Sequence, residues 1–310
     1  MDQRNVTKIT TIHLLGFQIP HNITFLVFFN FLVIYCVTIC GNLLIITLVS
    51  YSKSLHSPMY FFLSQLSVLD IFLITDILPN MISTVLVKKA IMSFSNCLTQ
   101  FYFFTIAESS ECCLLTVMSL DRYLAICKPL HYTLKMNFKF CCILVILCWI
   151  LGIFVAFVYI LTTSKLNFCG PNIIDHFFCD LEPILKLSCS DITAVQFQLA
   201  IFVLIFVVIP FLLIIVSYAY ILSAIFKIPS ITGRQKAFST CSSHLTVVCF
   251  YYGTLLCVYL IPNRGQRMEI TKLVSLLYTV VPPLINPIIY SLRNKELKKA
   301  LKKFTQNCLF

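Results

Sequence analysis

Seven long runs of apolar residues, separated by shorter polar segments, dominate the pattern of this chain. They occupy residues 25–50, 58–82, 98–121, 140–161, 196–223, 239–261 and 271–292. Each run is longer than the roughly 20 residues that an α-helix needs to cross about 30 Å of hydrocarbon. An open sheet would leave backbone N–H and C=O groups unpaired in lipid, so we expect helices. The pattern predicts an all-α membrane protein, a seven-transmembrane helix bundle.

A second helical pattern follows the last run. Apolar residues recur at helical spacing and lysines flank them: Leu297, Ala300, Leu301 and Phe304 against Lys298, Lys299, Lys302 and Lys303. This arrangement predicts a short amphipathic eighth helix that lies on an anionic membrane surface. The alternative is a solvated, charged tail.

Composition and charge give the topology. Charged residues make up 11% of the 310 residues, where soluble proteins have about 25%. The net charge of +11 raises nucleic-acid binding as an option, but the basic residues lie between the apolar runs, so we expect no nucleic-acid partner. Segments 51–57, 122–139, 224–238 and 293–310 hold 14 Lys and Arg, whereas segments 1–24, 83–97, 162–195 and 262–270 hold 8.

The positive-inside rule places the lysine-rich segments in the cytoplasm. The N-terminus is then extracellular, the C-terminus is cytoplasmic, and the chain is a multi-pass protein of the plasma membrane in contact with membrane lipid. Residues 1–24 are mixed and polar, so no cleavable signal peptide is evident and the first run is expected to act as an uncleaved anchor.

Met118–Tyr132 is the most informative stretch. It closes the third run, and Asp121 and Arg122 stand side by side where the hydrocarbon is expected to end. Asp121-Arg122-Tyr123 resembles the DRY motif of rhodopsin-like G-protein-coupled receptors, and the full stretch resembles the variant typical of odorant (olfactory) receptors. Three further strings resemble the same family: Pro58–Leu63 (PMYFFL), Lys236–Leu245 (KAFSTCSSHL) and Pro283–Asn294 (PLINPIIYSLRN). Together they cover essentially the whole chain.

The resemblance implies one receptor domain over residues 1–310, with an extracellular N-terminus 1–24, a helix bundle 25–292 and a cytoplasmic tail 293–310. It implies a receptor, not an enzyme, that binds a small volatile ligand in the extracellular half of the bundle. The partner would be a heterotrimeric G protein of the stimulatory olfactory type, which raises cAMP. The implied activation switch comprises Asp121, Arg122, Tyr123, Tyr218, Asn286, Pro287 and Tyr290.

A polar cluster is expected inside the bundle. Asp70 and Glu111 are carboxylates within apolar runs, where an ionisable residue indicates a functional site. By the resemblance they join Asn42 and Asn286 in a cluster that holds Na⁺ in some receptors. Carboxylate oxygens suit a small hard cation. The alternative is a protonated, hydrogen-bonded cluster without an ion; no other cofactor or metal is expected.

The ligand pocket implied by helix phase and resemblance is apolar with a few polar groups: Phe101, Phe104, Thr105, Glu108, Phe202, Phe206, Tyr252 and Tyr259. Glu108 is unusual, and it would bias the ligand toward amines or alcohols. The rival interpretation is an internal bond to Ser109, Tyr252 or another pocket group. Phe104 stands where aminergic receptors keep an aspartate, which argues against a standard biogenic-amine receptor.

Four cysteines are expected on the extracellular side: Cys97, Cys169, Cys179 and Cys189. An oxidising compartment favours two disulfides, and four cysteines allow three pairings. The resemblance implies Cys97–Cys179 and Cys169–Cys189. Asn5-Val6-Thr7 fits the N-glycosylation pattern, and Asn5 is preferred to Asn22 because Asn22 lies close to the membrane.

Other classes fit less well. A transporter or channel would also explain buried carboxylates, but it predicts repeats that the seven unequal runs lack. No phosphate loop, GxSxG, HExxH or zinc spacing is present, so an enzyme has no assembled catalytic group. Within the receptor class, a non-odorant metabolite remains an alternative ligand. Pro210 predicts a kink in the fifth run, and Pro282-Pro283 predicts a break in the seventh.

Overall fold

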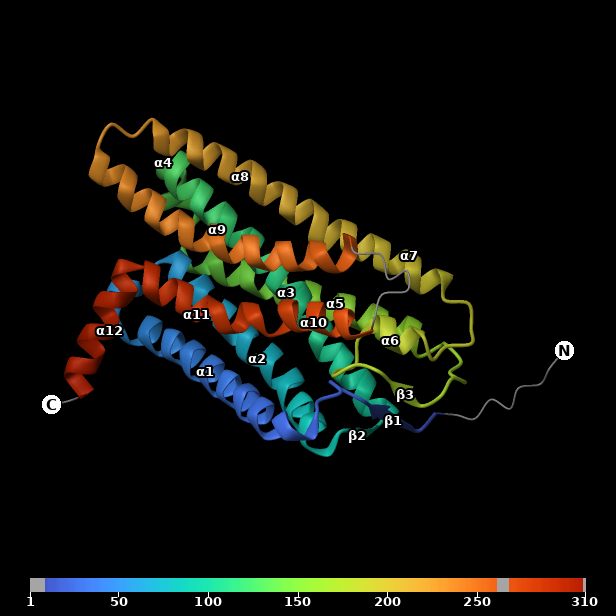
Figure 1. Cartoon of the computed structure of the whole chain (residues 1–310). Coiled ribbons are helices and arrows are strands. Elements are labelled where there is room, and N and C mark those ends of the chain that lie inside the picture. The colour runs from blue at the N-terminus through green and yellow to red at the C-terminus, as the bar shows by residue number, and fades with distance from the viewer. Residues whose placement is uncertain (1–8, 261–267, 309–310) are drawn as a thin grey trace.

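The computed structural model describes residues 9–260 and 268–308 and is mostly helical (Figure 1). The short elements are strands β1 (Thr11–Leu14), β2 (Ala90–Ser93) and β3 (Ile173–Ile174), turns η1 (His21–Ile23) and η2 (Lys53–Leu55), and helices α4 (Pro129–Lys135) and α6 (Leu181–Leu185). The longer helices are α1 (Thr24–Tyr51), α2 (Pro58–Val87), α3 (Phe94–Cys127), α5 (Phe138–Thr163), α7 (Thr193–Phe202), α8 (Ile209–Phe226), α9 (Ile231–Leu260), α10 (Met268–Thr279), α11 (Val281–Arg293) and α12 (Lys295–Cys308).

The seven-helix bundle predicted from the sequence is confirmed. Within the described ranges, six segments are long and apolar enough to cross a membrane: His21–Tyr51, Pro58–Val87, Phe94–Cys127, Phe138–Thr163, Thr193–Phe226 and Ile270–Ser291. Helix α9 packs among them as a further long helix with a more polar start. The amphipathic helix is also present as α12, with Leu297 and Ala300 buried and Lys298, Lys299, Lys302 and Lys303 exposed.

The third helix is longer than expected. It continues to Cys127, so Asp121 and Arg122 lie within the helix and not at its end. Helix α3 ends there because Lys128 precedes Pro129, and a residue before proline is disfavoured in the α region. Lys128 accordingly has φ −138° and ψ 60°.

The two proline sites alter their helices in different ways. Ahead of Pro210 the backbone forms a π-helical segment, η3 (Val203–Val208), before α8 begins. A proline lacks the N–H of the regular ladder, and a wider turn accommodates that loss. Ahead of Pro282-Pro283 the helix is interrupted at Val280, which separates α10 from α11.

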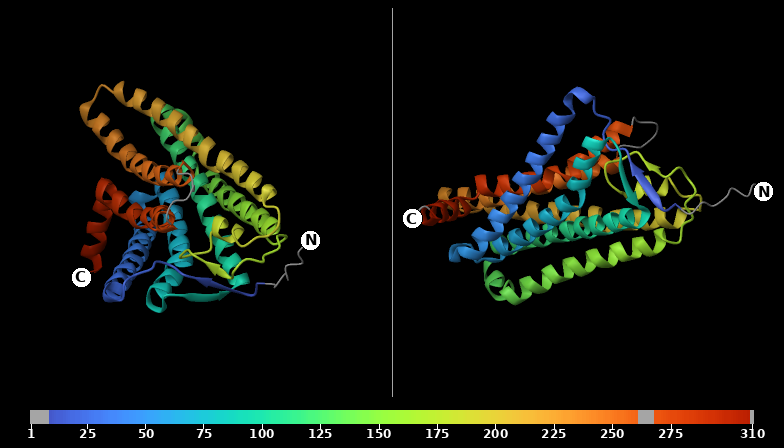
Figure 2. Two further views of the ribbon diagram at one scale, coloured as in Figure 1. Left: turned by 45° about the vertical axis from the view of Figure 1, so that its right-hand side comes forward. Right: turned by 90° about the horizontal axis from the view of Figure 1, so that it is seen from below.

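A small sheet forms at one end of the bundle, and the sequence did not predict it. β1 pairs antiparallel with β2 (Thr11 opposite Ser93) and parallel with β3 (His13 opposite Ile173). Ile12 and Leu14 are fully buried on one face of β1. We call this end the sheet end and the other, which carries α4 and α12, the α12 end (Figures 1 and 2). The sheet joins the N-terminal segment to the two loops that carry Lys88 and Asp175.

Close helix contacts fix α3 in the bundle. A Cβ atom at Gly152 of α5 would overlap Ser110 Oγ and lie 2.8 Å from the Ile106 carbonyl oxygen, so only glycine fits there. A Cβ atom at Gly41 of α1 would lie 3.1 Å from Pro287 Cγ of α11. Small residues of this kind let membrane helices approach closely. These close contacts bring α1, α3 and α11 together, so that their polar side chains lie in the same interior region of the bundle.

Candidate functional site

Glu108 lies in the middle of the bundle on α3 and is buried. Its Oε1 atom accepts a hydrogen bond from the Tyr251 hydroxyl of α9 at 2.9 Å. Its Oε2 atom is buried and has no hydrogen-bond partner among the described residues. The internal bond considered from the sequence therefore exists for one oxygen, but its donor is neither Ser109 nor Tyr252. The second oxygen remains available, and a buried acceptor without a partner is costly.

A first aromatic wall lies on one side of α3. Phe101 packs edge-on against Tyr159 of α5, with ring centroids 5.9 Å apart, and Tyr159 packs against Phe202 at the same distance. Phe202 stacks on Phe206 at 5.2 Å. This chain of rings connects α3, α5, α7 and η3 and is apolar apart from the buried Tyr159 hydroxyl.

A second aromatic wall lies toward α10. Phe104 packs against Phe178 at 5.2 Å and lies 6.2 Å from the Tyr278 ring. Thr105 donates its hydroxyl hydrogen to the Phe101 carbonyl oxygen of its own helix, at 2.7 Å. The structure thus places Phe101 and Phe104 in two different walls, both formed around the α3 segment that carries Thr105 and Glu108.

Tyr252 lies inward of both walls on α9. Its ring packs against Phe211 at 5.3 Å, and its hydroxyl donates weakly to the Cys112 carbonyl oxygen at 3.4 Å. The Tyr259 side chain and the Asn5 site lie outside the described residues. Of the polar pocket residues whose side chains the structure describes, Glu108 is the one with a buried atom that lacks a hydrogen-bond partner.

Three polar contacts join the loop after α5 to α10, and we call them the loop–helix seam. Lys272 Nζ lies 2.6 Å from Asp175 Oδ1, His176 Nε2 lies 3.2 Å from Ser275 Oγ, and Tyr278 donates to Asp180 Oδ2 at 3.0 Å. The Lys272 side chain is fully buried. The α10 residues are spaced by three, so they share one helix face.

Burial sets the protonation of two loop residues in the seam. Burial lowers the pKa of His176 to about 3, and the positive charge of Lys272 adds to this effect. His176 is therefore neutral at pH 7. Burial raises the pKa of Asp180, while hydrogen bonds from Leu181 and Tyr278 act in the opposite direction.

The same loop is tied to α3. The structure joins Cys97 to Cys179 and Cys169 to Cys189, with Cα atoms 5.4 and 5.9 Å apart, the pairing that the resemblance implied. Gln100 reinforces the first link, because its Oε1 accepts from the Cys179 backbone N–H at 3.0 Å. Loop residues 175–180 are thus held between α3 and α10.

The polar cluster forms deeper in the bundle. Asn286 Nδ2 lies 3.1 Å from both carboxylate oxygens of Asp70. Asn42 Nδ2 donates to the Pro283 carbonyl oxygen at 3.0 Å, which joins α1 to α11. Glu111 lies close enough to Asp70 for their charges to interact. The buried oxygens without hydrogen-bond partners among the described residues include both of Glu111, the amide oxygens of Asn42 and Asn286, and the Tyr290 hydroxyl.

At the α12 end, Arg122 pairs with its neighbour. Its Nε atom lies 2.9 Å from Asp121 Oδ2, and its terminal nitrogen contacts the same oxygen. The Tyr218 hydroxyl of α8 is instead 2.6 Å from His244 Nδ1 of α9, so it is not bonded to Arg122 here. Tyr123 packs edge-on against Tyr220 at 6.0 Å.

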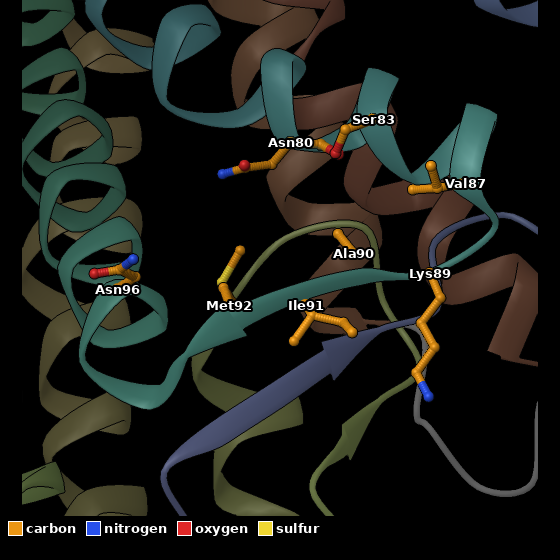
Figure 3. Close-up of a pocket in the computed structure, with 8 residues that line it drawn as sticks. All are labelled: Asn80, Ser83, Val87, Lys89, Ala90, Ile91, Met92 and Asn96. Atoms are coloured by element: carbon orange, nitrogen blue, oxygen red, sulfur yellow. The ribbon is translucent and has the colours of Figure 1, made fainter.

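A recess of about 420 Å³ opens at the sheet end between α2, β2 and α3. Figure 3 shows the Asn80 and Met92 side chains extending into it, with Asn96 at its edge on α3, while the Lys89 side chain points away. Most of its lining side chains are exposed. It is a surface feature, separate from the interior around Glu108.

Several functional contacts were not foreseen from the sequence. Lys272 is a cation inside the seventh apolar run, and that position is the one sequence signal that could have identified it. Tyr251, Tyr159 and His244 are residues of apolar runs, and no local signal distinguished them from packing residues. Their roles depend on contacts between distant helices.

Comparisons with known proteins agree across the chain. A family model described as olfactory receptor matches residues 31–307. The chain is 45% identical over 303 residues to olfactory receptor 11L1 of Homo sapiens, covering 98% of this chain and 94% of the relative. It is 47% identical over 306 residues to olfactory receptor 10A7 of Homo sapiens, covering 98% and 97%. It is 43% identical over 303 residues to olfactory receptor 1M1 of Mus musculus, covering 98% and 97%.

Proposed function

The chain belongs to the olfactory receptor family, and from that premise we propose that it binds a small volatile ligand in the bundle and activates a stimulatory olfactory-type G protein. Family membership makes it a multi-pass membrane receptor with an odorant-receptor function, and not an enzyme. The ligand site, the type of G protein and the rise in cAMP belong to the proposal.

We propose that the sheet end is extracellular, that the α12 end is cytoplasmic, and that residues 1–310 form one receptor domain. The distribution of Lys and Arg supports this orientation. The two disulfides at the sheet end support it too, because disulfides persist in an oxidising compartment.

The ligand site is proposed between the two aromatic walls. The observation that carries it is the uncommitted Oε2 atom of Glu108, which lies on the α3 segment between Phe104 and Cys112. Apolar walls with one or a few polar groups are typical of small-molecule sites, where the polar group sets orientation. An amine or alcohol could donate a hydrogen bond to Oε2 while Tyr251 holds Oε1 in place.

Activation requires that the ligand prefer the active arrangement, since equal affinity for both arrangements shifts nothing. Arg122 would leave Asp121 and contact the G protein, and Tyr218 would leave His244 to support the freed Arg122. The basic residues of segments 122–139 and 224–238 would frame the docking site. The Arg122–Asp121 pair lies on α3, and the Tyr218–His244 hydrogen bond joins α8 to α9. These positions support the proposed exchange of partners.

Sodium is proposed for the polar cluster. The buried oxygens of Glu111, Asn42 and Asn286 lack hydrogen-bond partners in the described part of the chain, and hard oxygens fit this cation. Asp70 and Glu111 would hold it, and the ion would offset one of their two negative charges. Among the described residues no group of three or more His, Cys, Asp or Glu could hold a metal ion.

Sodium chloride, compared with N-methylglucamine chloride, should raise the melting temperature of the wild type but not of Glu111→Gln.

The experiment for the proposed function is a cAMP assay with a chemically diverse odorant panel. Cells would express the receptor with the olfactory G protein, and surface expression would be verified. We expect a ligand-dependent rise that is absent in cells without the receptor. Amine or alcohol hits should lose potency roughly 10- to 100-fold in Glu108→Gln, the range for a hydrogen bond to a charged group. An unchanged ligand ranking in this variant would remove Glu108 from the site.

A further inference from the structure

A groove of about 680 Å³ runs along the outer surface of the bundle at the α12 end. Its floor is one face of α2, formed by Pro58, Phe61, Gln65 and Val68. Residues spaced by three and four lie on one helix face. Ten residues of helix extend about 15 Å, so the groove follows α2 inward for about that distance.

The two sides of the groove come from distant parts of the chain. Ile46, Val49 and Ser50 of α1 form one side, and Phe138 and Cys141 of α5 form the other. The start of α2 meets the end of α1 and the start of α5 in this region (Figure 2). Phe61 and Phe138 pack edge-on across it, with ring centroids 5.3 Å apart. The groove is thus a built, largely apolar channel between three spanning helices.

Val68, at the inner end of the groove, is 36% exposed and lies on a segment long and apolar enough to span a membrane. We therefore expect hydrocarbon around the inner end. A channel of apolar side chains that opens sideways at this depth can be filled by an acyl chain. The volume falls within the range of about 300 to 1,000 Å³ found for small-molecule sites.

Two lysines flank the groove in sequence. Lys53 lies two residues before the lining residue Leu55, and Lys139 directly follows the lining residue Phe138. Both lysine side chains are exposed, and no ion pair involves either of them in the described part of the chain. Segments 51–57 and 122–139 contain no Asp or Glu. These two segments therefore offer a negatively charged head group positive side chains and no carboxylate.

We propose that this groove binds one anionic phospholipid of the cytoplasmic leaflet, with an acyl chain along α2 and the head group between Lys53 and Lys139. The leaflet assignment rests on the proposed orientation. Anionic lipids of that leaflet are attracted to basic segments by about 1 kcal/mol per Lys or Arg, which corresponds to roughly fivefold in affinity for each lysine. The bound lipid braces Met136, just after α4, and Phe138, at the start of α5, against α2.

The test uses the purified full chain in lipid nanodiscs. Nanodiscs of phosphatidylcholine would be titrated with phosphatidylserine, and the thermal unfolding midpoint would be followed. We expect phosphatidylserine to raise the midpoint. The double variant Lys53→Gln/Lys139→Gln should need a roughly 30-fold higher fraction of phosphatidylserine for the same rise in the midpoint. The matched control Lys89→Gln/Lys165→Gln, which removes two exposed lysines at the sheet end, should respond as the wild type does.

A second variant tests the groove itself. Val68→Trp adds bulk at a partly exposed position of the floor, so it should fold and yet abolish the phosphatidylserine effect. The proposal would be overturned if the wild-type unfolding midpoint were the same in phosphatidylcholine with and without phosphatidylserine. It would also be overturned if phosphatidylserine raised the midpoint of Val68→Trp as much as that of the wild type. Stabilisation by cholesterol that Val68→Trp blocks while the lysine variant keeps it would overturn it too, because a sterol would then be the occupant. None of these readouts depends on signalling, so a silent odorant panel would leave them interpretable.

Discussion

Each end of the bundle holds an ion pair with one fully buried partner, and the two pairs are built differently. At the sheet end, Lys272 of α10 pairs with Asp175 of a loop that is far away in sequence. At the α12 end, Arg122 pairs with Asp121, its immediate neighbour on α3. The first pair joins two elements, whereas the second lies within one helix.

This difference bears on which end can move. Breaking the Asp121–Arg122 pair separates no helices, so the arginine can change partner without rearranging the fold. One contact that joins two helices there is the Tyr218–His244 hydrogen bond between α8 and α9. At the sheet end, the loop–helix seam and a disulfide hold the loop between α3 and α10. We therefore expect the sheet end to be stiff and the α12 end to hold the switch.

The largest effect should come from cutting the disulfide at the sheet end. Cys179→Ser opens a loop of 82 residues. The unfolded chain then gains conformational entropy, which lowers the free energy of unfolding by roughly 4 kcal/mol. Surface expression, measured by an external epitope, should fall to near background. Cys189→Ser opens a loop of 20 residues, and it should cost less. Equal surface levels for both variants would contradict this ranking.

The next effect should come from the seam. Lys272→Met removes a fully buried charge whose partner Asp175 is 33% exposed, so water can partly solvate the remaining carboxylate. We expect about 2 kcal/mol of destabilisation, below the 3 to 5 kcal/mol for breaking a fully buried pair. A double-mutant cycle with Asp175→Asn would measure the coupling. A coupling near zero would show that the seam does not depend on this pair.

Acidification should weaken the seam through His176. The folded pKa of about 3 lies below the unfolded value of 6.5, so the unfolded chain binds more protons between these values. The stabilisation is complete above pH 6.5 and is lost as the pH falls toward 3, by about 2 kcal/mol between pH 7 and pH 5. The raised pKa of Asp180 acts in the opposite sense, stabilising at low pH. The comparison of wild type with His176→Gln isolates the histidine. An identical pH dependence of the melting temperature would contradict its role.

The smallest effect on stability, with a distinct effect on signalling, should come from the α12 end. His244→Phe removes the hydrogen bond to Tyr218, which is worth about 1 kcal/mol. The Tyr218 hydroxyl keeps the Cys241 carbonyl oxygen as an acceptor at 3.3 Å. Basal cAMP should rise roughly fivefold, because the same free energy is removed from the inactive arrangement. Unchanged basal cAMP at equal surface level would mean that this bond does not restrain α9.

The sequence was informative where a local pattern carries the signal. Apolar runs of spanning length identified the helices, and the pattern after the seventh run identified α12. The motif residues Asp70 and Asn286 could be placed together through resemblance, and they are in contact. The break at Val280 followed from a proline pair, because proline acts on its own helix.

The remaining contacts depend on long-range packing. β1 has only four residues, and its partners come from two distant loops, so no local alternation could identify the sheet. The donor to Glu108 was missed because Tyr251 and Tyr252 are adjacent and differ only in helix phase. The Lys272–Asp175 pair could not be foreseen either, since the position of a long loop is fixed by its disulfides and not by its own sequence pattern.

The most direct test of this account is Arg122→Ala studied with an odorant that activates the wild type. Ligand-induced thermal stabilisation would report binding near the sheet end, and cAMP would report the switch at the α12 end, both at matched surface expression. The account predicts that the variant still binds the odorant but produces no rise in cAMP. A normal cAMP response in Arg122→Ala would contradict the assignment of Arg122 as the switch.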